Sequence, residues 1–347
     1  MTDRSTPRVG LVGAGSISHL HLPHLLSLGA DVLVYAQAGA AELVARYGGG
    51  LAASLDELLR EVDVVDVATP TYTHYDVARQ ALLAGKDVIC EKPLARTDAE
   101  VTALLELAGQ RGRRLFPAHV VRYFPEYVRL REAVRAGQLG DLAVLRFYRS
   151  GASPARVAWY ADPELSGGII VDQMIHDLDQ ARWLAGEVVR VSATWTRRPG
   201  IRPAEAAHVL LTHASGTITQ ASGIWGPPHL RFTTGYFAAG TGGVLAHDSA
   251  AERRYATDLA PADPGAAPGA APGAASGGGT GGGAIPDIDP AEDPYFLVLQ
   301  DLLGAIRDGT EPRTTAADGA QAVRIAAAAV ASARSGQPAD LAAGAAS

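Results

Sequence analysis

Three side chains of this sequence have the chemistry to move a proton and to stabilise a negatively charged oxygen: Lys92, Asp172 and His176. Lys92 follows an apolar, strand-like run that ends at Cys90, and Pro93 comes directly after it. Proline removes the next ladder donor and holds the residue before it in an extended backbone. A lysine at the carboxyl end of a parallel strand points into the crevice where doubly wound sheets bind ligands. We therefore predict a reactive lysine at position 92, although an isolated Lys-Pro is more often a surface turn.

Asp172 and His176 are four residues apart in a helix predicted from Ile169 to Leu184, so their side chains should share one face. A carboxylate beside an imidazole can orient the ring and raise its proton affinity, which makes a tunable acid or base. Taken alone, the pair could be an ordinary ion pair on a solvated helix face. Its neighbours argue against that interpretation, because a charged pair among apolar residues is unfavourable unless it faces a ligand. These neighbours are Ile169, Ile170, Val171, Met174 and Ile175.

A glycine-rich turn opens the chain. Val9 to Gly15 reads as a short strand that runs into glycines, and a helix is predicted from Ser16 to Leu28. In the pattern G-x-G-x-x-S, Gly13 allows a tight turn, Gly15 lets the backbone approach a pyrophosphate, and the small Ser18 lets helix and strand pack closely. The phosphates would lie over the helix N-terminus, attracted by its free N–H groups. This context predicts a dinucleotide cofactor.

The choice between NAD and NADP is left open by the second strand, predicted at Val32 to Tyr35. A dinucleotide site usually places an acid roughly 20 residues after the glycines, where it holds the ribose hydroxyls. Tyr35, Ala36 and Gln37 occupy that place, and Arg46 is the nearest arginine. The missing acid removes a repulsion against a 2′-phosphate, which favours tolerance of NADP.

Strand and helix patterns alternate through the first third of the chain. This alternation predicts a Rossmann-type sheet with right-handed crossovers. Two helix starts carry capping boxes, Ser54 to Glu57 and Thr97 to Glu100. The predicted elements are helices at 40–47, 54–60, 75–84 and 97–111 and strands at 62–68, 87–90 and 115–118.

From Tyr123 onward the pattern changes, and after a helix at 169–184 the strands follow one another without helices between them, joined by short polar turns. Such strands are typical of an antiparallel sheet, so we predict an α+β second domain. Its predicted elements are helices at 125–135 and 169–184 and strands at 142–149, 188–196, 207–213, 216–224 and 230–237. Residues 260–284 are rich in Pro, Gly and Ala and predict a flexible insertion. Helices at 295–308 and 319–335 are expected to return to the first domain.

Composition excludes some functions. The 347 residues, with 47% hydrophobic and 19% charged residues, allow two globular domains. A net charge of −7 without a basic stripe argues against nucleic-acid binding. The single cysteine, Cys90, excludes an internal disulfide, and the polar start of the chain shows no apolar signal segment. We expect a cytoplasmic protein that binds neither nucleic acid nor a membrane.

Four features stand in order: the glycine turn, Thr69-Pro70-Thr71 with His74, Glu91-Lys92-Pro93-Leu94, and Gly167-Gly168 followed by Asp172 and His176. Together they resemble the glucose-fructose oxidoreductase and inositol dehydrogenase family (Gfo/Idh/MocA), over nearly the whole chain. The resemblance implies a Rossmann domain and an open, mostly antiparallel α/β domain, often with oligomers formed through that sheet. It also implies oxidation or reduction of a secondary alcohol on a sugar, a cyclitol or a related compound with NAD or NADP.

The resemblance assigns roles residue by residue. Lys92 matches the lysine that contacts substrate and cofactor, Asp172 the substrate-binding acid and His176 the usual proton acceptor. Trp159 and Arg122 are further candidates for substrate contact, although both could equally be packing residues. The expected cofactor-binding residues are Gly13, Gly15, Ser16, Ile17, Tyr35, Ala36, Gln37, Thr69, Pro70, His74, Glu91 and Lys92. Two departures, Ser18 at the third glycine position and the missing acid, bear on cofactor preference.

We predict two domains, a Rossmann domain at 1–122 and a substrate-binding and oligomerisation domain at 123–347, in a homo-oligomeric enzyme. Two alternatives remain open. One is a sensor that binds NAD(P)H without catalysis. The other is a metal-dependent enzyme in which Asp172 and His176 bind a metal together with His208 or His213. For the histidines of the first helix, His19, His21 and His24, we favour a packing role beneath the dinucleotide.

Overall fold

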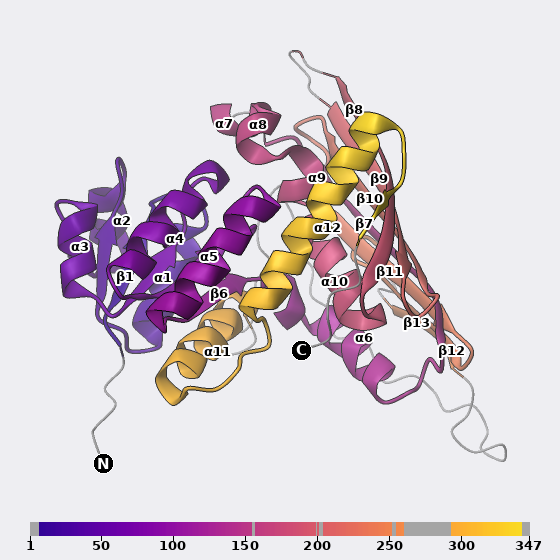
Figure 1. The fold of residues 1–347 in the computed structure, drawn as a ribbon, viewed down its shortest axis with the longest axis horizontal. Coiled ribbons are helices and arrows are strands. Elements are labelled where there is room, and N and C mark those ends of the chain that lie inside the picture. The colour runs from indigo at the N-terminus through magenta and orange to yellow at the C-terminus, as the bar shows by residue number, and fades with distance from the viewer. Residues whose placement is uncertain are drawn as a thin grey trace. The chain divides into compact units, whose positions relative to one another are not determined.

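The structure is a computed structural model of the chain, and it describes residues 7–154, 157–198, 200, 204–251, 255–259 and 293–341. The chain divides into two compact units (Figure 1). The first unit comprises Met1–Phe124, Asp162–Gly167 and Ile288–Ala327, and the second comprises Pro125–Ala161, Gly168–Asp287 and Ala328–Ser347. The predicted insertion at 260–284 lies outside the described residues.

The first unit is built on a parallel sheet of six strands in the order β3-β2-β1-β4-β5-β6. Every neighbouring pair in this sheet is parallel, which confirms the predicted doubly wound fold. The side chains of β1 and β4 are buried along their whole length, as expected for strands covered on both faces. The strands are β1 (Val9–Val12), β2 (Val32–Tyr35), β3 (Gly50–Leu51), β4 (Val64–Val67), β5 (Asp87–Glu91) and β6 (Leu115–Ala118).

Helices surround these strands (Figure 1). Both predicted caps are present: Ser54 accepts a bond from the Glu57 N–H, and Thr97 and Glu100 form a complete capping box. The helices are α1 (Ser18–Ser27), α2 (Ala40–Tyr47), α3 (Leu55–Glu61), α4 (His74–Leu83), α5 (Asp98–Arg111), α8 (Pro163–Ser166), α11 (Pro294–Asp308) and α12 (Ala316–Ser335) as far as Ala327, with short 3₁₀ turns η1 (Thr71–Thr73) and η2 (Val120–Tyr123).

The late helices of the first unit are held by specific contacts. Arg114, which precedes β6, donates to the carbonyl of Ala305 at 2.8 Å and to the carbonyl of Thr310. Gly319 lies close to the core, since a Cβ there would be 2.7 Å from Leu94 and 3.0 Å from Pro117. A larger side chain at position 319 would therefore lie too close to the core, so α12 needs a small residue there.

The second unit contains an eight-stranded sheet in the order β13-β12-β11-β7-β10-β9-β8-β14. The pair β7 and β10 is parallel and the other neighbours are antiparallel, so the sheet is mixed but mostly antiparallel, as predicted. Strands β12, β13 and β14 were not predicted. The strands are β7 (Leu142–Ala152), β8 (Val188–Arg198), β9 (Ala204–His213), β10 (Ile218–Gly226), β11 (Thr233–Gly240), β12 (Gly243–Asp248), β13 (Tyr255–Leu259) and β14 (Ala339–Asp340).

One face of this sheet packs against helices α9 (Gly168–Asp172) and α10 (Ile175–Ala185), and the alternation along the strands reflects it. In β9, Ala207, Val209 and Leu211 are buried, whereas the intervening Leu210 is exposed. The remaining helices of the unit are α6 (Pro125–Arg135), α7 (Ala158–Ala161) and the end of α12. None of the helices in the described ranges combines the length and the apolar character needed to cross a bilayer.

The single helix predicted from Ile169 to Leu184 is wrong. The structure has two helices, with a break at Gln173 and Met174. The N–H groups of both these residues donate to the Ile169 carbonyl, which ends α9. The side chain of Met174 fits against Gly223 of β10, where a Cβ would lie 2.6 Å from Met174 Cγ. Packing of this methionine against the sheet therefore accompanies the break between α9 and α10, which hydrophobic spacing alone does not reveal.

Candidate functional site

The glycine turn after β1 has the geometry that the sequence predicted. Gly13 has a φ of +123°, and a Cβ there would lie 2.3 Å from the carbonyl oxygen of Ala68. Its N–H donates to the Tyr35 carbonyl at 2.8 Å, which ties the turn to the end of β2. Only glycine fits such a backbone this close to β4. The turn at Gly13 is confirmed.

The residues that follow Gly13 leave room for a ligand. A Cβ at Gly15 would meet no heavy atom within 4 Å, so the backbone here faces open space. Ser16 and Ile17 lead into α1, and Ile17 as N-cap provides no side-chain bond to the first N–H groups of the helix. Ser18 is fully buried, as expected for close packing of helix and strand. An open glycine followed by an uncapped helix start fits the pyrophosphate of a dinucleotide.

The end of β2 carries no charge for the adenosine ribose. Tyr35 ends the strand, Ala36 is half-buried and Gln37 is exposed. The guanidinium of Arg46 lies over the ring of Tyr47, 5.1 Å from its centre. Neither a carboxylate for NAD nor an arginine for a 2′-phosphate follows directly after this strand.

His74 braces the ends of β4 and β5. Its Nδ1 lies 2.7 Å from the carbonyl oxygen of Pro93, and its Nε2 lies 2.8 Å from that of Thr69. Burial lowers the pKa of this ring, which is 1% exposed. The ring faces backbone carbonyls and holds the ends of β4 and β5 together, and cofactor binding by His74 stays a prediction. It supports the neighbouring Thr69-Pro70 segment, which keeps its place among the cofactor candidates.

Lys92 is the accessible residue of an otherwise buried turn. Glu91 before it is buried, Pro93, Leu94 and Ala95 after it are buried, and Lys92 itself is half-exposed. Its backbone N–H donates to Glu91 Oε2 at 3.1 Å. The chain therefore presents the ammonium-bearing residue at the carboxyl end of β5, where parallel sheets bind ligands.

His21 was expected to pack under the dinucleotide, but the structure gives it ionic partners. Its Nδ1 lies 2.8 Å from Asp66 Oδ2, and its Nε2 lies 3.3 Å from Glu91 Oε1. Burial alone would lower the pKa of His21, but the two carboxylates outweigh that effect and raise the pKa to about 10. The same contacts lower the pKa of Glu91 despite its burial. Sequence reasoning missed this cluster, and the signal for it was an aspartate inside the apolar strand β4.

Asp172 and His176 belong to the second unit. Asp172 is the last residue of α9, and His176 lies in the first turn of α10, so the predicted sharing of one helix face is wrong. From Gly168 to Ala181 every residue is buried except His176, which is half-exposed. An imidazole that alone reaches the surface of a buried stretch is available to a ligand. Asp172 is 9% exposed.

Two carboxylates hold the helices that carry this pair. Glu205 Oε1 accepts from the Ile169 N–H at 2.7 Å and from Trp195 Nε1 at 2.9 Å, which fixes the start of α9. A Cβ at Gly168 would lie 2.4 Å from the Trp195 ring, so glycine is required there. At the start of α10, Asp177 accepts from Arg149 Nε at 2.9 Å. Both helix starts are therefore anchored to the sheet.

Trp159, in the same unit, is half-buried in α7 and stacks on Tyr160 with ring centres 3.8 Å apart. Tyr160 in turn meets the buried Trp225 edge to face at 6.3 Å. An aromatic surface that is rigid and partly exposed suits the apolar face of a sugar ring. Trp159 therefore stays a proposed substrate contact.

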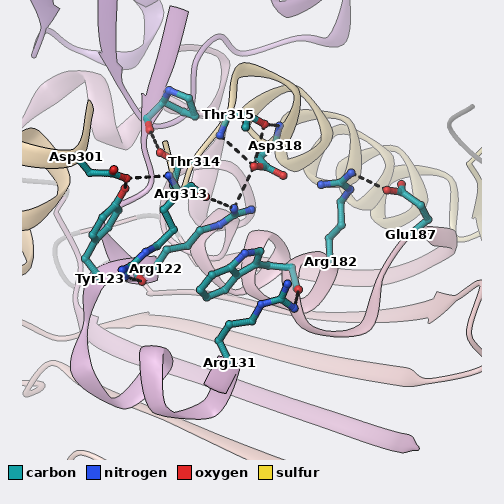
Figure 2. Close-up of polar contacts among 12 residues, drawn as sticks. Arg122, Tyr123, Arg131, Arg182, Glu187, Asp301, Arg313, Thr314, Thr315 and Asp318 are labelled. Atoms are coloured by element: carbon teal, nitrogen blue, oxygen red, sulfur yellow. Dashed lines mark hydrogen bonds and ion pairs between the residues drawn. The ribbon is translucent and has the colours of Figure 1, made fainter. Parts of the chain in front are cut away.

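Arg122 does not lie on an accessible surface. It is 1% exposed, and its guanidinium donates to the Arg313 carbonyl at 2.8 Å and pairs with Asp318 at 3.1 Å (Figure 2). Arg313 donates back to the Arg122 carbonyl, and Tyr123 donates to Asp301 at 2.6 Å (Figure 2). These contacts join η2 to α11 and α12. The side chain of Arg122 is engaged within the first unit, and a substrate contact by Arg122 stays a prediction.

The metal hypothesis gains no support from the geometry. His213 Nδ1 lies 2.8 Å from the Gly186 carbonyl and Nε2 lies 2.9 Å from Thr219 Oγ1, so both ring nitrogens are engaged. His208 is on the opposite, exposed face of β9. In the part of the chain that the structure describes, no group of three or more His, Cys, Asp or Glu side chains could hold a metal ion.

Comparison with known proteins agrees with both halves of this description. Residues 7–119 match the description "Oxidoreductase family, NAD-binding Rossmann fold", and residues 127–246 match "GFO/IDH/MocA C-terminal domain". Inositol 2-dehydrogenase of Rhizobium meliloti (strain 1021) is 34% identical over 196 residues, 54% of this chain and 58% of that protein. Myo-inositol dehydrogenase Hyg17 of Streptomyces leeuwenhoekii is 35% identical over 191 residues, 53% of this chain and 58% of that protein. The similarity thus spans less than two thirds of these relatives.

Solved structures show the same fold. A structure titled as a putative myo-inositol dehydrogenase from Sinorhizobium meliloti 1021 is 24% identical, with a TM-score of 0.77, over 96% of this chain and 99% of that one. GenD2 from gentamicin A biosynthesis, solved with NAD, is 24% identical with a TM-score of 0.80 over 96% of both chains. Since the two family matches together cover more than half of the sequence, the chain belongs to the Gfo/Idh/MocA oxidoreductase family, with an NAD-binding Rossmann fold at its N-terminus.

Proposed function

We propose that this protein is an NAD(P)-dependent dehydrogenase that oxidises a secondary alcohol of a sugar, a cyclitol or a related small molecule to a ketone, and catalyses the reverse reduction. The observation that carries the proposal is that one Rossmann unit has both a glycine turn with open space at Gly15 and an accessible lysine at the end of β5. The nicotinamide, when bound, supplies the hydride acceptor at its C4 atom.

Lys92 would donate a hydrogen bond from its ammonium to the hydroxyl oxygen that reacts. As the carbinol C–H electron pair leaves with the hydride, this oxygen gains negative charge. A positive group already in place stabilises that charge without reorganisation. The buried residues on either side of Lys92 support such a fixed position.

His176 would take the hydroxyl proton during oxidation and return it during reduction. Its exposure among buried neighbours supports this role. Asp172, which is mostly buried at the end of α9, would orient the substrate by accepting a hydrogen bond from a second hydroxyl. Overall, the alcohol loses one hydride and one proton and becomes a ketone.

The substrate class is supported by the relatives, two of which are named inositol dehydrogenases. The half-exposed Trp159 would pack against the apolar face of a ring-shaped polyol. For the cofactor, the uncharged Tyr35-Ala36-Gln37 segment supports use of both NAD and NADP. The cytoplasmic location stays a prediction.

A homo-oligomer is also part of the proposal. Leu210, Ile218 and Ile224 are 46%, 47% and 45% exposed and lie on the face of the second sheet that does not pack on α9 and α10. These exposed apolar side chains alternate with polar ones on the same face, and exposed large apolar residues on one sheet face are typical of an association surface. We propose that a second copy of the chain covers it.

The proposal is tested with a panel of inositols, free sugars and nucleotide-linked sugars, each with NAD and NADP, by following absorbance of the reduced nicotinamide. The variants Lys92→Ala and His176→Ala should each lower kcat by about 10²- to 10⁴-fold, the usual scale for acid–base groups. Cofactor affinity, measured by fluorescence, should change little.

Matched controls exist for both variants. Lys86 is the other lysine of the chain and precedes β5 at its opposite end, and His208 is an exposed histidine on β9. Lys86→Ala and His208→Ala should retain full turnover. Wild-type turnover in Lys92→Ala or His176→Ala would remove that residue from the mechanism. Tight cofactor binding without turnover of any alcohol would favour the sensor alternative.

A further inference from the structure

Three ionisable side chains meet in the interior of the first unit. His21 comes from α1, Asp66 from the middle of β4 and Glu91 from the end of β5. The side chains of His21 and Asp66 are 0% exposed, and that of Glu91 is 10% exposed. We call these three residues the buried triad. Charged side chains are rarely buried so completely unless they are paired with one another.

The order of the contacts places the imidazole between two carboxylates. Nδ1 of His21 is 2.8 Å from Asp66 Oδ2, and Nε2 is 3.3 Å from Glu91 Oε1. Nδ1 is hydrogen-bonded to Asp66, whereas Nε2 and Glu91 are at ion-pair distance without hydrogen-bond geometry. A ring that faces a carboxylate at each nitrogen is favoured in its positively charged form. The raised pKa of His21 agrees with this charge.

Glu91 links His21 to the backbone of Lys92. One carboxylate oxygen of Glu91 faces His21, and the other accepts the backbone N–H of Lys92 at 3.1 Å. On the far side of the turn, the Pro93 carbonyl is 2.7 Å from the ring of His74. The Lys92 backbone is thus held on one side through Glu91 and on the other through His74.

We propose that His21 is a positioning residue for Lys92: as an imidazolium it fixes the Glu91 carboxylate, which in turn fixes the backbone from which the Lys92 ammonium projects. This inference rests on the proposed function where it concerns catalysis, but the positioning itself is a property of the unliganded protein. His21 touches neither substrate nor cofactor in this account. Removing the positive charge of His21 would leave the Glu91 carboxylate without this partner and allow the Lys92 ammonium to move. A displacement of about 1 Å at a catalytic group can lower the catalytic rate by about 10²-fold.

The sequence offers a direct experiment, because the chain contains only two lysines, Lys86 and Lys92. Protein labelled with ¹⁵N-lysine therefore gives two backbone amide signals. The Lys86 N–H donates to the Ala81 carbonyl at 3.0 Å, away from the buried triad, and serves as an internal reference. In His21→Gln, amide hydrogen exchange at Lys92 should accelerate by about tenfold or more, the effect of weakening one charge-assisted hydrogen bond. Exchange at Lys86 should stay unchanged.

His24→Gln is the matched control, since His24 lies in the same helix and pairs with a different carboxylate, Asp293, at 3.1 Å. It should leave the Lys92 amide as protected as in the wild type. Equal protection of Lys92 in His21→Gln and wild type would overturn the proposal, as would equal acceleration in the His24→Gln control.

Kinetics supply a second readout that a purely structural role would not produce. In His21→Gln, kcat should fall by about 10²-fold while KM for the cofactor changes little. Glu91→Gln should show a similar loss, and combining the two substitutions should add almost nothing, because both break one chain of contacts. Strictly additive losses would overturn the proposal. If the wild type turns over no alcohol, the proposed function fails, and the exchange measurement still decides the positioning.

A third measurement covers the case in which His21→Gln does not fold. In wild-type protein labelled with ¹⁵N-histidine, the ring of His21 should carry protons on both nitrogens at about pH 8, well below its raised pKa. A neutral His21 ring at that pH would overturn the proposal.

Discussion

Lys92 illustrates how a single residue becomes available for chemistry while its surroundings are fixed. The residues on both sides are buried, and its N–H is bound by Glu91. His176 shows the same arrangement in the second unit, where it alone of residues 168–181 reaches the surface. In both places the backbone is immobilised by packing and only the reactive side chain is accessible. Such preorganisation favours charge stabilisation in a transition state.

The charge of His21 predicts a pH dependence of stability. Its folded pKa of about 10 lies above the ordinary value of 6.5, so its contribution is complete below about pH 6.5 and is lost as the pH rises through about 10. The unfolding free energy of the wild type should therefore fall over this range more steeply than that of His21→Gln, measured by urea titration. Parallel pH profiles would contradict an ionised His21. The ionisable groups that interact with the ring are Asp66, Glu91 and His24. His74, Lys92 and Cys90 interact with Glu91.

His21→Gln should also be less stable at neutral pH. Loss of the cation leaves two buried carboxylates without their shared partner, and breaking a buried ion pair costs about 3–5 kcal/mol. His24→Gln should cost about 1 kcal/mol, the scale of one hydrogen bond, because burial lowers the pKa of His24 and its ring is neutral in the contact with Asp293. Equal stabilities of the two variants would argue against the ionic account of the triad.

Cofactor choice is also decided by single residues. Ala36 follows β2, at the position where an acid would hold the ribose hydroxyls of NAD. Ala36→Asp should raise KM for NADP by about tenfold or more and lower KM for NAD, because a carboxylate repels a 2′-phosphate. Initial rates with both cofactors measure this change. An unchanged ratio of kcat/KM values would mean that Ala36 does not face the ribose.

At the scale of elements, an ion pair joins α12 to η2, the short turn that follows β6. Asp318 accepts hydrogen bonds from Arg122, from the Thr315 N–H and from Thr315 Oγ1. The same carboxylate therefore caps the start of α12 and neutralises a buried guanidinium. Burial would raise the pKa of Asp318, but these donors lower it to about 2. A carboxylate with a lowered pKa stabilises the fold above its unfolded pKa and loses this effect as the pH falls through the folded pKa.

Asp318→Asn should therefore reduce the free energy of unfolding by about 2 kcal/mol at about pH 6, the equivalent of the shift in pKa. The difference from wild type should narrow as the pH falls towards about 3. Urea titrations at several pH values measure both effects. A variant as stable as the wild type at about pH 6 would show that Arg122 does not depend on this carboxylate.

The positions of helices were predictable from the sequence where residues within the helix itself determine them. The capping residues Ser54 and Thr97 and the helix at 125–135 agree with the structure, because caps and amphipathic spacing act within one element. The break between Asp172 and His176 was not predictable, since it accompanies the packing of Met174 on Gly223 of a strand about fifty residues later. The burial of Arg122 was not predictable for the same reason: its partners, Arg313 and Asp318, are distant in sequence.

At the scale of the whole molecule, two units with different sheet types divide the proposed chemistry. The first supplies the dinucleotide turn and Lys92, and the second supplies Asp172 and His176. The type of each sheet followed from the sequence, because alternating helices imply parallel strands and short turns imply antiparallel ones. The parallel pairing of β7 with β10 did not follow, since it joins strands separated by four helices and two strands.

The exposed sheet face of the second unit predicts the oligomeric state. Replacing Leu210 and Ile218 with lysine introduces two charges into an apolar face and should reduce the mass in solution to that of the 36.0 kDa monomer. Light scattering after size-exclusion chromatography measures this mass. The matched control is the exposed Leu51, at the edge of the first sheet, where lysine should change nothing. A wild type that is already monomeric would contradict the proposal.

The most direct test of the central claim follows the hydrogen itself. A cyclitol or sugar that the enzyme oxidises is prepared with deuterium on the carbinol carbon, and the reduced cofactor is examined by mass spectrometry. Direct transfer predicts that the deuterium appears on the nicotinamide, that the rate falls with the heavier isotope when chemistry limits turnover, and that Lys92→Ala slows the transfer. Reduced cofactor without deuterium would contradict hydride transfer from the alcohol carbon.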